Sequence, residues 1–174
     1  TLPIAVMVIG TAIASLPASM LMRRHGRRQG FLIGALLGIA GSLLCAYALH
    51  EWSFAAFVAG HFLLGSYQGF ANYYRFAAVE AAGPSQASKA ISLVVAGGVV
   101  AAFLGPQLGQ WGRDWIGGQI FVGSYLAQGA LSLIALLLIS RLHLPRVAAA
   151  HDGLSRSLRE ILSQGAVAPH HRDK

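Results

Sequence analysis

Four polar side chains recur at helical spacing in the otherwise apolar stretch 52–78: His61, Gln68, Asn72 and Arg75. At about 100° per residue they fall within roughly 60° of one another on a helix. An imidazole can exchange a proton near neutral pH, and amides and a guanidinium can bind polar groups of a solute. Because polar groups that face lipid are costly, we expect this stripe to line a solute pathway between membrane helices.

Each of these side chains also has a purely structural interpretation. His61 could hydrogen-bond a neighbouring helix, and the two amides could hold helices together. Arg75 could extend to the membrane surface or pair with Glu80. The aromatic residues Tyr67 and Tyr74 are expected on roughly the opposite face, where they would pack or anchor the helix.

The composition indicates a membrane protein. Of 174 residues, 55% are hydrophobic and 11% charged, whereas a soluble domain carries about 25% charged residues. The 21 glycines suit helices that pack closely within a bilayer. The single cysteine, Cys45, lies in an apolar run and excludes an internal disulfide. We therefore predict an all-α, polytopic transmembrane helical bundle that needs neither a metal nor an organic cofactor.

Five apolar runs are long enough to cross a bilayer. A polar and basic segment, 141–174, follows them as a predicted cytoplasmic tail or linker, with a short amphipathic helix over residues 154–162. The predicted spans cover residues 2–22, 30–49, 52–78, 90–111 and 119–139.

The basic residues alternate between the two sides of this predicted topology. The turns at 23–29 and 75–89 and the tail hold twelve of the 13 Lys and Arg residues, and the opposite turns hold only Arg113. The positive-inside rule then places the amino terminus outside and the tail in the cytoplasm. Nucleic acid is not an expected partner, since no aromatic residues interleave with the basic clusters. Five spans with an outside start suggest that an earlier helix is missing.

The basic turn carries a motif. Residues 19–28, SMLMRRHGRR, match G-x-L-x-D-R-x-G-R-R at Leu21, Arg24, Gly26, Arg27 and Arg28. This segment resembles the signature between the second and third helices of the major facilitator superfamily. Arg23 stands where that family has an Asp that belongs to a charge relay.

Two further segments support the resemblance. Gly105, Pro106 and Gly109 are similar to the antiporter signature G-x-x-x-G-P-x-x-G-G of the fifth helix. Gln68-Gly69 resembles the end of the fourth-helix signature R-x-x-Q-G, with Gly65 in place of the Arg that is often tied to proton coupling. The resemblance implies helices two to six of a twelve-helix transporter, with gating roles for the motif residues Arg24, Gly26, Arg27, Arg28, Gly105, Pro106 and Gly109.

These observations predict transport of a small polar or amphipathic solute by alternating access, with proton-coupled antiport, in the plasma (bacterial inner) membrane. The partners would be the solute, protons, the lipid bilayer, and missing helices or a second half-bundle. One alternative is a non-transporting membrane fragment or scaffold. An intramembrane enzyme is disfavoured, because Ser66 lies off the face of His61 and no H-E-x-x-H motif occurs.

Overall fold

The computed structural model describes residues 1–142, which form helices and turns with no strand among them. Four of its segments are long and apolar enough to cross a membrane: Leu2–His25, Arg27–His50, Pro84–Asp114 and Val122–Arg141. The predicted all-α membrane bundle is confirmed. The tail from residue 143, with its predicted amphipathic helix, lies outside the described residues. The elements are α1 (Leu2–His25), α2 (Arg27–His50), α3 (Phe54–Ala71), α4 (Tyr74–Ala82), α5 (Ala87–Trp111) and α6 (Val122–Arg141), with 3-10 turns at Pro84–Gln86 and Gly112–Asp114.

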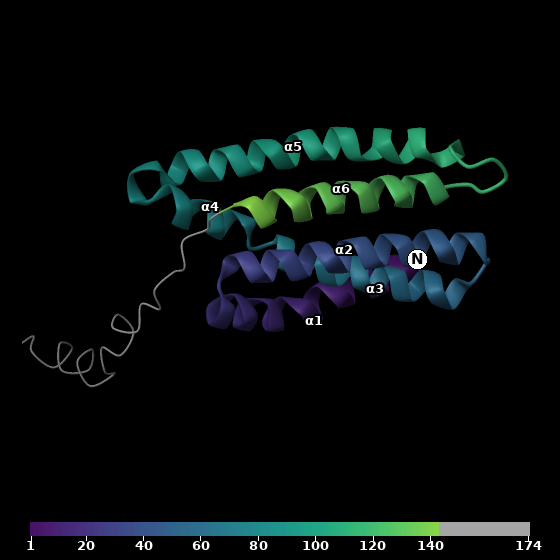
Figure 1. Cartoon of the computed structure of the whole chain (residues 1–174), viewed down its shortest axis with the longest axis horizontal. Helices are drawn as coiled ribbons and strands as arrows, with labels where there is room; N and C mark the ends of the chain where they lie inside the picture. Colours follow the sequence, from purple (N-terminus) through teal and green to yellow (C-terminus); the bar gives the residue numbers. More distant parts are fainter. Residues whose placement is uncertain (143–174) are drawn as a thin grey trace, which may run out of the picture.

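Helix α3 packs between α1 and α2, and α2 also contacts α6 along much of its length (Figure 1). Small residues bring these backbones together. A Cβ added at Gly65 would overlap the backbone carbonyl of Met7, and the Thr11 hydroxyl lies 3.0 Å from the Gly65 carbonyl oxygen. Close backbone approach through small residues is how membrane helices associate without a hydrophobic driving force between them. These contacts fix which face of α3 is turned toward α1.

A single residue separates α1 from α2. We expected a basic turn at 23–29, but α1 continues to His25 and α2 begins at Arg27. Gly26 makes the reversal with φ 92° and ψ 159°, a conformation that residues with a Cβ rarely adopt. The arginines of the motif therefore extend from helix ends, which gives them fixed positions.

The expectation of one continuous helix over 52–78 is wrong. Helix α3 ends at Ala71, Asn72 and Tyr73 form a turn, and α4 begins at Tyr74. The break is held by tertiary contacts: the Tyr73 hydroxyl donates to the Ser15 carbonyl oxygen at 3.1 Å, and Tyr74 packs on Phe31 with ring centroids 4.5 Å apart. The chain therefore changes direction in the middle of the predicted polar stripe.

Helix α5 is the least enclosed element of the described chain. None of its residues is buried, and it contacts α4 more than α6, beside which it runs in Figure 1. Its glycines have no close neighbours: a Cβ added at Gly97, Gly105 or Gly109 would have no atom within 4 Å. By contrast, Gly34, Gly38 and Gly41 of α2 are all buried against neighbouring helices.

Candidate functional site

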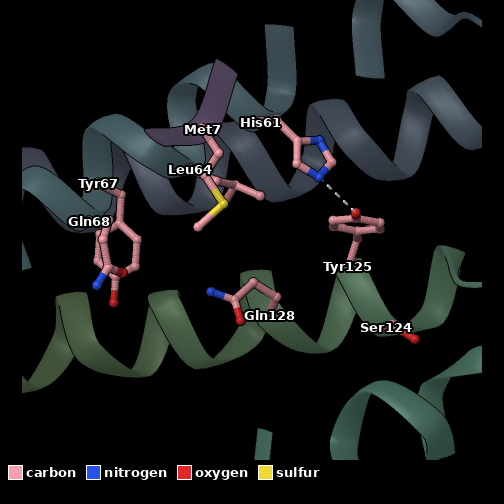
Figure 2. A pocket seen from close by; sticks show the side chains of 8 residues that line it. All are labelled: Met7, His61, Leu64, Tyr67, Gln68, Ser124, Tyr125 and Gln128. Atoms are coloured by element: carbon pink, nitrogen blue, oxygen red, sulfur yellow. Dashed lines mark hydrogen bonds between the residues drawn. The ribbon is translucent and has the colours of Figure 1, made fainter. Parts of the chain in front are cut away.

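A cavity of about 330 Å³ lies between α3 and α6, with one residue of α1 at its edge (Figure 2). This volume is at the lower end of the range for small-molecule pockets. No Asp, Glu, Lys or Arg is among its lining residues, so its polarity comes from an imidazole, amides and hydroxyls. The lining residues are Met7, His61, Leu64, Tyr67, Gln68, Ser124, Tyr125 and Gln128.

His61 is held at one end of the cavity by three hydrogen-bonding neighbours. Its Nδ1 lies 2.9 Å from the Phe57 carbonyl oxygen and 3.6 Å from Cys45 Sγ, and its Nε2 lies 3.3 Å from the Tyr125 hydroxyl (Figure 2). Because a carbonyl oxygen can only accept, Nδ1 carries the proton in this arrangement. Nε2 faces the Tyr125 hydroxyl, with which it can share one hydrogen bond. Phe57 packs against His61 with ring centroids 4.4 Å apart.

Two primary amides face the cavity from opposite helices. Gln68 extends from α3 and Gln128 from α6, and Figure 2 shows Gln128 directed toward α3. Within residues 1–142 neither amide makes a hydrogen bond to protein. The ring of Tyr67 lies beside Gln68 at the opposite end of the cavity from Tyr125 (Figure 2). The cavity thus offers uncommitted donors and acceptors between aromatic rings.

The structure divides the predicted stripe into two pairs. His61 and Gln68 meet at the cavity, whereas Asn72 ends α3 and Arg75 belongs to α4; both are exposed and neither lines the cavity. The division follows from the break after Ala71. The four residues would share one face only on a single continuous helix. Tyr67, expected on the opposite face, lies in the cavity beside Gln68, so that expectation is wrong.

The motif arginines make contacts at the far end of the bundle from the amino terminus. Arg27 binds Glu80 of α4, with Nε 2.9 Å from Oε2, and its guanidinium also lies 6.0 Å from the centroid of the Tyr73 ring. Arg28 donates to the carbonyl oxygen of Ser140 near the end of α6. Glu80 is thus paired with Arg27 and not with Arg75. Arg24 is exposed.

The segment that resembles the antiporter signature lies within α5 and contacts one cavity residue, Ser124. Pro106 is inside the helix, and Gly105 meets no neighbour. The Ser124 hydroxyl donates to the Gly109 carbonyl oxygen at 2.6 Å. This bond joins α5 to the part of α6 that carries Tyr125. Within residues 1–142 no group of three His, Cys, Asp or Glu side chains could hold a metal ion.

The residues of α6 were not anticipated. Ser124, Tyr125 and Gln128 lie at offsets of 0, 1 and 4 in an otherwise apolar span, which is the same signal that identified the α3 stripe. Applying the rule to every predicted span would have found them. No sequence pattern indicates that they face His61, which lies about 64 positions earlier.

A bundle of apolar helices joined by one-residue and short turns, with a neutral polar cavity between two of them, defines a helical membrane protein with a solute-sized internal site. The family model described as Major Facilitator Superfamily matches residues 1–167. The chain belongs to the major facilitator superfamily.

Two curated relatives are transporters by name. The riboflavin transporter RfnT of Brucella anthropi is 42% identical over 166 residues, which cover 93% of this chain and 42% of that protein. Sugar transport protein 1 of Arabidopsis thaliana is 41% identical over 64 residues, which cover 37% of this chain and 12% of that protein. The chain therefore spans less than half the length of either relative. No solved structure is significantly similar to it.

Proposed function

We infer that the chain forms part of a transporter that moves a small solute across a membrane by alternating access. The observation that carries this is the cavity between α3 and α6, which holds polar side chains without fixed partners inside a bundle of the superfamily. In such transporters two repeats rock about a central site. The cavity would be one wall of that site, and further helices or a second half-bundle would supply the other wall.

Riboflavin is the first substrate to test. The support is the 42% identity to the riboflavin transporter of Brucella anthropi, which covers 93% of this chain. A neutral cavity lined by aromatic rings and amides is compatible with an uncharged aromatic solute.

Proton-coupled antiport is the coupling that we propose, with His61 as the proton carrier. His61 is the one cavity residue whose ordinary titration range includes neutral pH. His61 Nε2 lies 3.3 Å from the Tyr125 hydroxyl, which can donate to it while Nε2 carries no proton. Protonation at Nε2 would replace this acceptor with a donor, so the contact between α3 and α6 would have to rearrange. Uptake of a proton would thereby alter the two helices that line the solute site.

The proposed orientation follows from charge. Arg23, Arg24, Arg27 and Arg28 lie at one end of the bundle, while Arg113 is the one basic residue near the other end within the described residues. The positive-inside rule favours a cytoplasmic location for the arginine-rich end and an external amino terminus, in a bacterial inner membrane. Asn72 and Arg75 remain proposed members of the solute pathway on the cytoplasmic side of the cavity.

The test is uptake of labelled riboflavin into sealed vesicles that contain the intact protein, under a proton gradient imposed in each direction. We expect riboflavin to accumulate with only one direction of the proton gradient, and a protonophore to abolish this accumulation. Gln68→Ala should slow uptake about tenfold, and Asn72→Ala should have a smaller effect because Asn72 lies outside the cavity. Uptake no greater than in protein-free vesicles would contradict the proposal for this solute, and normal flux in both variants would remove the stripe from the mechanism.

A further inference from the structure

The two glutamines of the cavity offer a pattern of donors and acceptors that the proposed function does not yet explain. Each primary amide presents a carbonyl acceptor next to an N–H donor. Gln68 and Gln128 present theirs from facing helices, α3 and α6, and within the described residues neither amide is bonded to protein. Gln68 is exposed and Gln128 half-buried, so both amides are free to bond a solute that enters the cavity.

The charges of the cavity restrict the ligand. No Asp, Glu, Lys or Arg lines it. A charged group placed among these residues would lose hydration without gaining an opposite charge. The part of the ligand that contacts the two glutamines is therefore uncharged. It must carry hydrogen-bond donors and acceptors that pair with amides.

The aromatic and apolar lining restricts its shape. Tyr67 and Tyr125 lie at opposite ends of the cavity, with Leu64 and Met7 along one side (Figure 2). Ring faces and a thioether favour contact with a flat, polarisable ring system. A sugar would instead require many hydroxyl partners, and this lining supplies few.

Building on the proposed transport function, we propose that Gln68 and Gln128 are specificity-determining residues that recognise the cyclic imide edge of a neutral heteroaromatic solute. A cyclic imide carries an N–H between two carbonyl groups. One glutamine amide can accept from the N–H and donate to one carbonyl, and the other glutamine can donate to the second carbonyl. Two amides therefore satisfy all three polar groups of the edge, while the rings of Tyr67 and Tyr125 contact the flat body of the solute.

The inference can be tested by equilibrium binding, separately from transport. The probes are lumichrome, which has a free imide N–H, and its N3-methyl derivative, in which a methyl group replaces that hydrogen. Binding to the purified intact protein is followed by the fluorescence of the probe. Because a site built to bond an N–H rejects an analogue that lacks it, we expect the intact protein to bind lumichrome at least tenfold more tightly than the methylated probe.

Variants show which residues cause the preference for lumichrome over its methylated derivative. Gln68→Leu and Gln128→Leu keep similar volume and remove the amide, so each should lower the tenfold preference to about twofold or less. Gln107→Leu makes the same chemical change on α5, outside the cavity, and should keep the preference of the unmodified protein. Retained binding of the methylated probe shows that a variant is folded. If a leucine variant does not fold, the comparison of the two probes on the unmodified protein decides by itself.

The outcomes separate this inference from the proposed transport. Equal affinity for the two probes, no binding of either, or an unchanged preference in both leucine variants would overturn imide recognition, even if riboflavin is transported. Discriminating binding without riboflavin uptake would support the recognition site and count against the transport of this solute.

Discussion

At the scale of single residues, the central feature is the contact between His61 and Tyr125. The Tyr125 hydroxyl lies 3.3 Å from His61 Nε2, and Nδ1 is occupied by the Phe57 carbonyl oxygen at 2.9 Å. The imidazole therefore has one nitrogen committed to its own helix and the other directed to α6. In the proposed mechanism, a change in its protonation would act on the contact between the two helices that line the cavity.

This geometry leads to a prediction for His61→Gln. The amide can keep a hydrogen bond to Tyr125 but cannot carry a proton at any physiological pH. We expect gradient-driven accumulation of the solute to fall about tenfold, while solute-for-solute exchange without a gradient persists. Both are measured in the same vesicles. Gradient-driven accumulation equal to that of the unmodified protein would show that His61 is not the proton carrier.

The polar stripe predicted from the sequence includes two of the eight residues that line the cavity, His61 and Gln68. Their role in transport stays a prediction. The helical wheel failed for Tyr67 because a wheel gives relative angles only, and the contact of Gly65 with α1 sets the absolute orientation of α3. The partners on α6 depend on tertiary packing, which a single span does not encode.

At the scale of elements, the closest packing lies between α1 and α3. We predict that Gly65→Leu destabilises the intact protein by about 2 kcal/mol or more, because any side chain there must displace the backbone near Met7. The measurement is the midpoint of thermal unfolding in detergent, followed by loss of helical signal. Gly117→Ala is the matched control, since a Cβ there meets nothing within 4 Å, and it should leave the midpoint unchanged. An unchanged midpoint for Gly65→Leu would mean that α1 and α3 are not packed as described.

A second prediction at this scale concerns the ion pair between Arg27 and Glu80. The two side chains are 21% and 33% exposed, so solvent weakens the pair and its coupling free energy should be modest, about 1 kcal/mol. Arg27→Glu and Glu80→Arg should each reduce transport, and the charge-swapped double variant should recover part of it. A double-mutant cycle on uptake rates measures the coupling. Strictly additive losses would show that the pair has no role in the transport cycle.

The elements also show which parts of the fold the sequence could predict. Hydropathy predicted the apolar helices well, because a bilayer demands long apolar segments. It missed the break at Asn72 and Tyr73, where no Pro or Gly marks the end of α3 and the Tyr73–Ser15 hydrogen bond stabilises the turn. The length of the turn predicted at 23–29 was also too great, since one glycine with positive φ is enough to reverse the chain.

At the scale of the whole molecule, the outer surface fits a bilayer. Large apolar side chains such as Leu16 and Phe103 are 70% and 75% exposed, which in water would promote aggregation. The unburied helix α5 and the open side of the cavity both fit a chain that spans 42% of its riboflavin-transporting relative. We propose that further helices complete the solute site.

The most direct measurement of the central claim is the accessibility of the cavity to water in the membrane. In the intact protein with Cys45→Ser, single cysteines are placed at Gln128, in the cavity, and at Leu126, an exposed apolar position of the same helix. We predict that a membrane-impermeant, water-soluble thiol reagent modifies Gln128→Cys, that the solute slows this modification, and that Leu126→Cys does not react. An unreactive Gln128→Cys beside a reactive Leu126→Cys would contradict a solute path between α3 and α6.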